Sequence, residues 1–306
     1  MPQPSARAVT ARRISAGPYL ILVFSVAAFG FTGIFAHMAD APGMVVATWR
    51  VAIAALALAV PFLRQPPEAR RLNREGVRRV LIGGTIFPIS LAGFHIALDH
   101  TSAANATFLG NIAPIWVGLI TLVFLKERLP RLFWPGVGVA MIGAALIVFG
   151  DTGLTGIRAG DLIVLANSTV WAVYQVYTGQ ARATISTLTW VWWIMVISSA
   201  YMIPITQLMG YPLFGYDNGT VWAMLGAGIV SQVLGFMGYN YALGRIQAAR
   251  VSVINMGQPV VTAIFAYLLL GEPFGGLRLM GGGLVLGGIY LVNQRDHVPQ
   301  TKQTPA

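Results

Sequence analysis

Residues 93–146 read GFHIALDHTSAANATFLGNIAPIWVGLITLVFLKERLPRLFWPGVGVAMIGAAL, and residues 238–291 read GYNYALGRIQAARVSVINMGQPVVTAIFAYLLLGEPFGGLRLMGGGLVLGGIYL. The two stretches align without a gap at an offset of 145 residues, and 13 pairs are identical, among them Gly93 and Gly238, and Pro114 and Pro259. The sequence therefore contains one unit twice. Many secondary transporters are built from such a duplicated apolar unit, with the solute path between the two copies.

The composition is that of a membrane protein. Hydrophobic residues make up 56% of the 306 residues and charged residues only 10%, which is too apolar for an ordinary soluble domain. The net charge of +10 does not indicate nucleic acid binding, because the basic residues lie in short gaps between apolar runs rather than among other polar groups on one surface. The chain has no cysteine, so disulfides and thiolate metal sites are excluded.

Ten apolar runs have about the length of 17–25 residues that crosses a bilayer as a helix. We expect spans over residues 19–38, 44–63, 80–98, 102–125, 132–149, 161–177, 187–208, 221–243, 251–270 and 277–293. The predicted fold class is an all-α integral membrane protein in which two inverted five-helix repeats surround a central cavity. The repeats are inverted because five is odd, so the second copy enters the membrane from the other side.

Basic residues mark one side of the predicted membrane protein. Seventeen of the 20 Lys and Arg residues lie in the two termini and in the gaps after even-numbered spans, while Arg158 and Arg278 lie on the other side and Arg50 lies within a span. The positive-inside rule then predicts that both termini lie in the cytoplasm. The expected location is the inner (cell) membrane, which the chain crosses several times. A cleaved signal peptide is the competing interpretation of the first run, but 20 apolar residues exceed the usual core of about 7–15.

The predicted organisation follows from these spans. Residues 1–18 form a cytoplasmic tail, 19–149 the first repeat, 150–160 an extracytoplasmic linker, 161–293 the second repeat and 294–306 a second cytoplasmic tail.

The motifs resemble one known family. They include Ala97-Leu98, the run from Thr101 to Ala106, Glu127-Arg128-Leu129 and, in the second copy, Gly271-Glu272-Pro273, together with Arg50. This set resembles the EamA-type, ten-span branch of the drug/metabolite transporter superfamily, over nearly the whole chain from Tyr19 to Asn293. The resemblance implies a bacterial inner-membrane exporter of amino acids, related metabolites or small drug-like compounds, and it implies no particular substrate.

Two prolines mark the candidate solute path. Pro114 and Pro259 lie near the middle of spans 4 and 9, where proline removes a backbone hydrogen bond. We predict that both spans kink there and line the path, although a purely structural kink is an equal alternative. Polar and small residues follow helical spacing around them: Thr107, Asn111, Gly118 and Thr121 in span 4, and Ser252, Asn255 and Thr262 in span 9. These stripes either line a cavity or bind helices to one another.

Further candidate substrate-binding residues lie at mid-depth in three other places. They are Asn167, Ser168, Trp171, Tyr174 and Gln175 in span 6, Ser231, Gln232, Tyr239 and Asn240 in span 8, and Gln258 beside Pro259. Amides and hydroxyls bind ammonium or carboxylate groups, and aromatic rings stack on apolar ones. Hydrogen bonding between helices is the alternative. We expect Trp190, Trp192 and Trp193 to anchor at the membrane interface.

Arg50 and His95 are candidates for gating or coupling. Arg50 is the only formally charged residue placed inside a span, and it either attracts a substrate carboxylate or binds helix carbonyls and snorkels outward. His95 is a candidate proton relay, because the carboxylates lie in tails, gaps or span edges. We expect Glu127 and Glu272 to cap the next helix, and the glycines of spans 5 and 10, namely Gly136, Gly138, Gly143, Gly281, Gly283 and Gly287, to allow close packing.

Three classes of function fit a membrane protein of this size. An intramembrane enzyme is disfavoured, because the sequence has no H-E-x-x-H, no G-x-S-x-G and no paired intramembrane aspartates. A non-catalytic scaffold or sensor subunit would be expected to have longer tails. The leading hypothesis is a secondary transporter working by alternating access on small zwitterionic or amphiphilic solutes, with import of similar solutes as an alternative. We expect no metal, no cofactor, no nucleic acid, no known protein partner, and a monomer or homodimer.

Overall fold

The computed structural model describes residues 16–149, 156, 158–270 and 275–294, and their regular secondary structure is helical throughout. The first repeat contains α1 (Ala16–Met38), α2 (Gly43–Leu63), α3 (Pro67–Arg70), α4 (Arg74–Leu98), α5 (Ala103–Gly110), α6 (Ala113–Val123) and α7 (Phe133–Phe149). The second contains α8 (Ala159–Ala181), α9 (Thr187–Leu208), α10 (Asn218–Gly226), the π-helix η1 (Ala227–Gly235), α11 (Phe236–Leu243), α12 (Ala248–Asn255), α13 (Gln258–Leu270) and α14 (Gly276–Asn293).

The helix bounds repeat at the offset found in the sequence. Adding 145 to the bounds of α5 gives residues 248 and 255, which are the bounds of α12. The same addition takes α2 to residues 188–208, and α9 spans residues 187–208. It takes α4 to residues 219–243, and α10, η1 and α11 together span residues 218–243. The duplication therefore extends to the early spans, where the sequences themselves share little.

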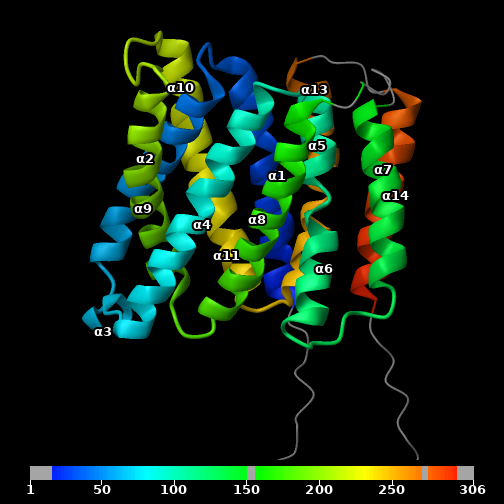
Figure 1. Cartoon of the computed structure of the whole chain (residues 1–306), viewed down its shortest axis with the longest axis horizontal. Helices are drawn as coiled ribbons and strands as arrows, with labels where there is room; N and C mark the ends of the chain where they lie inside the picture. The colour runs from blue at the N-terminus through cyan, green and yellow to red at the C-terminus, as the bar shows by residue number, and fades with distance from the viewer. Residues whose placement is uncertain (1–15, 150–155, 157, 271–274, 295–306) are drawn as a thin grey trace, which may run out of the picture.

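The two repeats run in opposite directions. In Figure 1, α7 rises from the lower end of the molecule to the upper end, and α14 descends beside it. The pair α5 and α6 descends, whereas the equivalent pair α12 and α13 rises. We call the lower end, which carries α3 and the start of α4, the arginine-rich end, and the other the opposite end. The predicted inverted repeat is confirmed.

Glycines bring α7 and α14 together. A Cβ on Gly143 would lie 2.5 Å from the Gly281 carbonyl oxygen, and a Cβ on Gly136 would lie 2.8 Å from the Gly288 carbonyl oxygen. Such backbone contact is possible only for residues without a side chain. The predicted close packing is therefore present. Gly138, Gly283 and Gly287 do not take part, because a Cβ on any of them would have nothing within 4 Å among the described residues.

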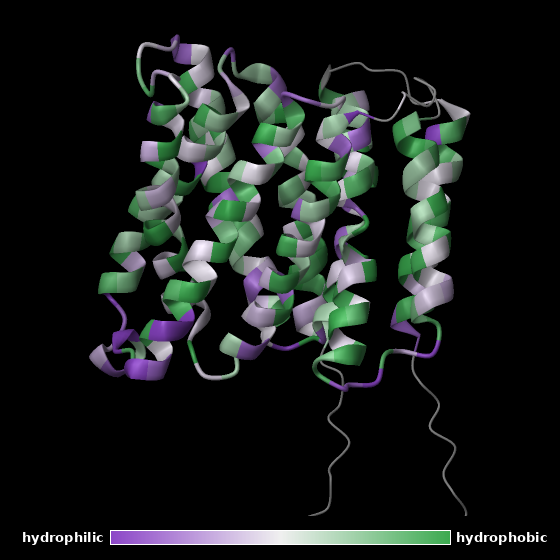
Figure 2. Ribbon diagram, viewed as in Figure 1, coloured by the Kyte–Doolittle hydropathy of each residue, from purple (hydrophilic) through white to green (hydrophobic). Residues whose placement is uncertain are grey.

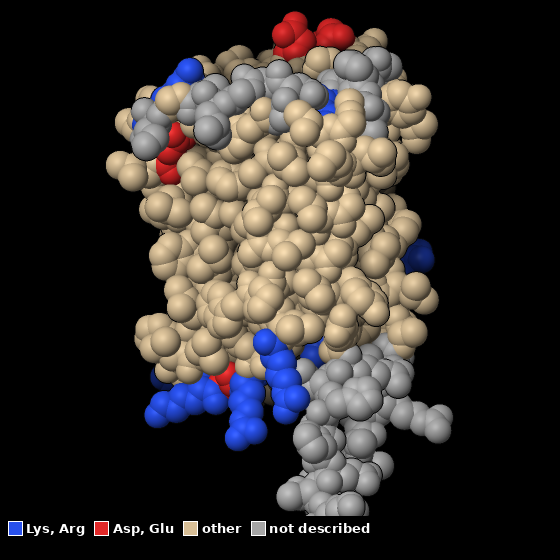
Figure 3. Space-filling model, turned by 90° about the vertical axis from the view of Figure 1, so that its right-hand side faces the viewer, with Lys and Arg blue, Asp and Glu red and all other residues tan. Residues whose placement is uncertain are grey.

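The surface fits a bilayer. Large apolar side chains are exposed around the bundle, such as Leu56 at 70% and Leu162 at 69%, and apolar residues dominate the middle of the molecule in Figure 2. In the face shown by Figure 3, Lys and Arg gather at the lower end and a broad band is almost without charge. Apolar surface of this extent is stable in lipid and not in water.

Eight described segments are long and apolar enough to cross a membrane: α1, α2, α4, α5–α6, α9, α10–α11, α12–α13 and α14. The helix α7 is apolar but has 17 residues, and α8, with 23 residues, is not among the eight. Together the ten segments follow the ten predicted spans. The short helix α3 was not predicted.

Two predicted roles at the membrane surface are wrong. Trp190 is fully buried among α4, α8 and α9 instead of lying at the interface, because its ring fills the space left by Gly83, whose Cβ would lie 2.5 Å from it. Glu127 does not cap α7, which begins six residues later; its carboxylate accepts a hydrogen bond from Gln247 Nε2 at 3.3 Å. Glu272 and most of the predicted linker, 150–155 and 157, lie outside the described residues.

Candidate functional site between the two repeats

Both repeats contain a broken helix at the same position. The break between α5 and α6 falls at Asn111 and Ile112, and the break between α12 and α13 falls at the equivalent Met256 and Gly257. Pro114 and Pro259 each occupy the second position of the helix that follows, where proline is favoured because its missing N–H is not needed. Spans 4 and 9 were predicted to kink, and the structure goes further: each is divided into two helices just before its proline.

The polar stripe of the first broken helix divides into two parts. Thr107 is exposed and Asn111 partly exposed, and the Asn111 Nδ2 donates to the Thr107 carbonyl at 2.8 Å. Thr121 is buried, and a Cβ on Gly118 would lie 2.5 Å from the Phe133 ring of α7. Only the part before the break is accessible, and the part after it packs against α7.

The stripe of the second broken helix is more enclosed. The Ser252 side chain is buried, and its hydroxyl donates to the Ala249 carbonyl at 2.8 Å. Asn255 Oδ1 is buried without a partner among the described residues. Gln258 Nε2 donates to the Phe29 carbonyl of α1 at 3.4 Å, and Thr262 Oγ1 to the Gly30 carbonyl at 3.2 Å. These last two bonds join α13 to α1, and Pro259 is buried beside them.

A buried hydrogen-bond network closes the bundle between α8, α9 and α11. Asn240 Oδ1 accepts from Tyr174 Oη and from Trp190 Nε1, both at 3.2 Å. The Tyr239 hydroxyl donates to Gln175 Oε1 at 2.7 Å. All five side chains are at most 1% exposed. Buried polar groups satisfied in this way rigidify a core, so this region is firmly packed.

An aromatic stack continues from that network toward mid-membrane. Trp171 stacks on Tyr174, with ring centroids 5.3 Å apart and planes 15° apart, and on Tyr239 at 6.0 Å and 14°. Trp171 and Asn167 are partly exposed, and Asn167 has no hydrogen-bond partner among the described residues. Ser168, in contrast, is buried and accepts from Trp116 Nε1 at 3.0 Å. Trp171 and Asn167 are thus the predicted residues of α8 that are left available to a solute.

The π-helix holds the other two predicted residues of span 8. Ser231 Oγ donates to the Ala28 carbonyl at 3.1 Å, and Gln232 Nε2 donates to Met195 Sδ at 3.3 Å. Both side chains are buried in contacts between helices. A π-helical stretch of this length, Ala227–Gly235, is rare and often marks a functional region, and no pattern in the sequence indicated it.

Arg50 and His95 lie closer to the opposite end. Arg50 Nε and His95 Nδ1 are buried, and neither has a partner among the described residues. The His95 ring lies against Gly43, the first residue of α2, since a Cβ there would be 2.9 Å from Nδ1. The His95 ring of α4 therefore packs on the start of α2, the helix that carries Arg50.

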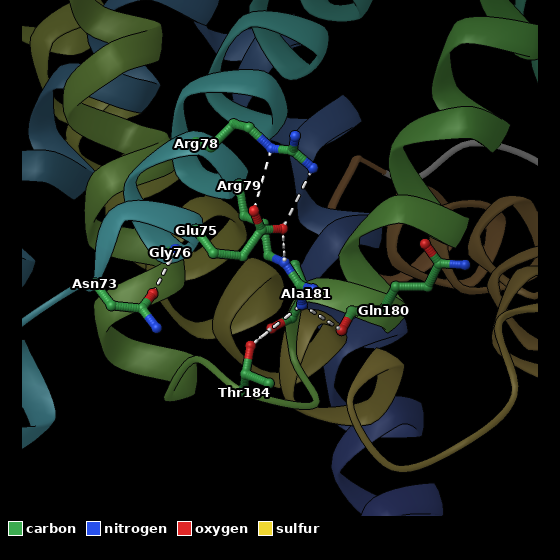
Figure 4. Close-up of polar contacts among 8 residues, drawn as sticks. All are labelled: Asn73, Glu75, Gly76, Arg78, Arg79, Gln180, Ala181 and Thr184. Atoms are coloured by element: carbon green, nitrogen blue, oxygen red, sulfur yellow. Dashed lines mark hydrogen bonds and ion pairs between the residues drawn. The ribbon is translucent and has the colours of Figure 1, made fainter.

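Charged groups hold the repeats together at the arginine-rich end. Figure 4 shows Glu75 between Arg78 and Arg79, with Arg79 reaching across to the turn that follows α8. Arg79 bonds Glu75 at 2.9 Å and donates to Thr184 Oγ1 at 3.2 Å. Arg182, in the same turn, donates to the Asn240 carbonyl at 3.4 Å and to the Thr187 hydroxyl. Burial, aided by the charge of Arg245, lowers the pKa of Arg182 to about 10, so it stays protonated at neutral pH.

A second polar link joins the repeats at the opposite end. The buried carboxylate of Asp161, in the first turn of α8, accepts from the Thr101 hydroxyl, from Asn105 Nδ2 at 3.0 and 3.1 Å, and from the Arg158 backbone N–H at 2.8 Å. These donors compensate the buried charge. Loop contacts of this kind were not predicted, because the sequence does not show which loops meet.

The comparisons with known proteins agree with this architecture. The model of the EamA-like transporter family matches residues 17–149 and again 158–294, and the chain therefore belongs to that family. A solved crystal structure, 18% identical, superposes with a TM-score of 0.76 over 91% of this chain and 96% of that one, which shows the same fold.

Several similar proteins are transporters by name. An uncharacterized transporter of Archaeoglobus fulgidus is 27% identical over 90% of this chain and 98% of its own length. A probable terminal-alkyne amino-acid exporter of Streptantibioticus cattleyicolor is 28% identical over 80% and 82% of the two chains, and the pseudopaline exporter of Pseudomonas aeruginosa is 26% identical over 87% and 93%. The chain is thus a multi-pass membrane protein and a secondary transporter.

Proposed function

We propose that this protein exports amino acids or related metabolites across the inner membrane by alternating access, with both termini in the cytoplasm. The relatives with named cargo are exporters of amino acids or of pseudopaline. The excess of Arg at one end of the bundle supports placing that end in the cytoplasm. The residues proposed to meet the solute are the predicted residues that are exposed or partly exposed, namely Thr107, Asn111, Asn167 and Trp171, together with Asn255, whose buried Oδ1 has no partner among the described residues.

Unequal packing of equivalent segments supports the alternating-access part of this proposal. In residues 238–243, at the arginine-rich side, Gly238, Tyr239, Asn240, Ala242 and Leu243 are all buried, whereas in the equivalent residues 93–98 only Ala97 is. In α12 five of eight residues are buried, against two of eight in α5. Inverted repeats that are alike in fold and unlike in packing are expected of a transporter caught in one of two alternating states. The arrangement supports a state that is closed toward the cytoplasm and looser toward the outside.

A transport assay tests the proposal. Liposomes that contain the purified protein are loaded with each of the twenty radiolabelled amino acids in turn. The rate at which the label leaves them is compared with the rate from protein-free liposomes. We expect faster exit of a subset of amino acids. No acceleration for any of them, in either orientation of the protein, would contradict the proposed cargo. Uptake of labelled amino acid into liposomes that hold an excess of unlabelled amino acid would show exchange. Accumulation of the labelled amino acid by cells that express the protein would instead favour import.

A further inference from the structure

Arg50 is a partly buried arginine whose guanidinium has no counterpart among the described residues. It lies in the first half of α2, and its Nε is inaccessible. In the part of the chain that the structure describes, no oxygen accepts a hydrogen bond from its guanidinium and no carboxylate forms an ion pair with it. A guanidinium has five N–H donors and stays charged in proteins. A guanidinium inside a membrane helix is costly unless it is paired, so a partner is expected.

Arg182 shows how this fold treats an arginine with a structural role. Its side chain is also buried, but it donates to the Asn240 carbonyl and to the Thr187 hydroxyl, and it joins α8 to α9 and α11. Arg50 joins no two helices in this way. The structural interpretation, in which Arg50 binds helix carbonyls, therefore lacks the contacts it requires.

His95 adds a second nitrogen group without a partner at the same place. It comes from α4, across from α2, and its Nδ1 is buried and unbonded within the described structure. Its ring lies against Gly43, where a Cβ would be 2.9 Å from Nδ1, and Arg50 follows Gly43 on the same face of α2, two helical turns later. Two nitrogen groups from two helices thus share a site that contains no described acceptor.

The second repeat shows that the fold does not require these residues. At the offset of 145, Met195 stands in the place of Arg50 and Asn240 in the place of His95. Both are fully buried and both have partners: Met195 Sδ accepts from Gln232, and Asn240 accepts from Tyr174 and Trp190. The same two helix positions are therefore filled by an uncharged pair with hydrogen-bond partners in one repeat, and by a charged arginine and a neutral histidine without partners among the described residues in the other.

We propose that Arg50 and His95 bind the carboxylate of the transported solute. A carboxylate accepts two parallel N–H bonds from a guanidinium, and neutral His95 donates one more from its ring. The inference rests on the proposed transport function and names its substrate class: the solute carries a free carboxylate, and an analogue without it is discriminated against.

The test uses analogues that differ only in the carboxylate. The probes are L-leucine, L-phenylalanine and L-threonine, each with its amide, and sodium benzoate against benzamide. Binding is measured from the intrinsic tryptophan fluorescence and the Tm of purified protein, and transport in liposomes of phosphatidylcholine alone, so that no anionic lipid competes. We expect the carboxylate member of at least one pair to bind roughly tenfold or more tightly than its amide, the usual size of a charged hydrogen bond.

Three variants assign that preference to the site. Arg50→Met, which introduces the residue of the second repeat, should remove the preference while leaving Tm unchanged or higher, because an uncompensated charge is lost. Arg50→Lys should retain part of it, and His95→Leu should weaken it by less than Arg50→Met. The matched control is Arg64→Gln, which removes an exposed arginine just after the same helix. It should change neither the carboxylate preference nor the Tm.

The outcomes separate this inference from the proposed function. Transport without preference for the carboxylate, or a preference that survives in Arg50→Met, would overturn the site and leave the transporter intact. A lower Tm in Arg50→Met would also overturn it, since that would show a structural arginine. If no amino acid is transported but benzoate binding is lost in Arg50→Met, the site stands and the proposed cargo fails. Absence of any carboxylate preference in the unchanged protein overturns the site.

Discussion

His95 and Asn240 occupy the same position in two copies of one helix, and their surroundings are opposite. Asn240 is fully buried and holds Tyr174 and Trp190 through hydrogen bonds. His95 is partly exposed, and its Nδ1 has no partner among the described residues. Around them, residues 238–243 are packed and residues 93–98 are loose.

This difference separates what the two repeats share from what they do not. The helices have equivalent bounds in the two repeats, and the helix breaks before Pro114 and Pro259 fall at equivalent residues. The burial of equivalent side chains differs between the two repeats. In an alternating-access cycle, the packing of the two ends is the feature expected to exchange, while the glycine contacts between α7 and α14 stay as they are.

The largest expected effect comes from placing a bulky residue in the packed end. Gly238→Val would put its Cβ into Ser25 Oγ and 3.0 Å from the Ile21 side chain, and overpacking of this kind costs about 1–3 kcal/mol or more. Gly93→Val is the matched control, because its Cβ would meet only the tip of Asn167 at 3.0 Å. Thermal unfolding in detergent should show a clear loss for the first and a small one for the second. Equal losses would mean that the two ends are packed alike.

The next largest effect is expected from removing the hydrogen bonds that Asn240 accepts in the packed end. Asn240→Ala leaves the Tyr174 hydroxyl and the Trp190 N–H buried without an acceptor, at about 1–3 kcal/mol for an unsatisfied group. His95→Ala removes no protein hydrogen bond and should leave Tm nearly unchanged. The comparison fails if His95→Ala destabilises the protein as much as Asn240→Ala does.

A smaller effect, on turnover rather than stability, is expected at the helix breaks. Pro114→Ala and Pro259→Ala restore the N–H that would let each helix continue through its break, so transport should slow several-fold at normal expression. Pro88→Ala is the control, since Pro88 lies inside the uninterrupted helix α4. Liposome efflux rates measure this, and full activity in both variants would remove the breaks from the mechanism.

The sequence predicted the repeat, its inversion and a departure from regular helix near Pro114 and Pro259, because each depends on a local pattern: apolar runs of span length, an odd number of spans, and prolines at equivalent residues. The sequence could not show which residues of the two polar stripes are exposed and which are buried. Thr107 and Ser252 are equivalent and similar in chemistry, yet one is exposed and the other buried, which depends on the tertiary arrangement of the bundle. Trp190 was misplaced for the same reason, since the space beside Gly83 that receives its ring is formed by another helix.

An apolar cavity at the opposite end was also beyond the sequence. It has a volume of about 250 Å³ and is lined by α2, by the loop before α10 and by α10 itself, with Trp49 bonded to the Leu213 carbonyl at 2.7 Å. No periodic pattern predicts it, because the loop supplies part of its wall. It belongs to the looser of the two ends.

The most direct test of the unequal packing uses this same equivalent pair, Thr107 and Ser252. The protein has no cysteine, so Thr107→Cys and Ser252→Cys each carry a single thiol whose reaction with a membrane-impermeant maleimide can be followed in right-side-out and inside-out vesicles. We predict that Thr107→Cys is labelled from the outside and that Ser252→Cys is labelled slowly from both sides. Equal labelling of the two thiols, each from its own side of the membrane, would contradict a structure closed toward the cytoplasm.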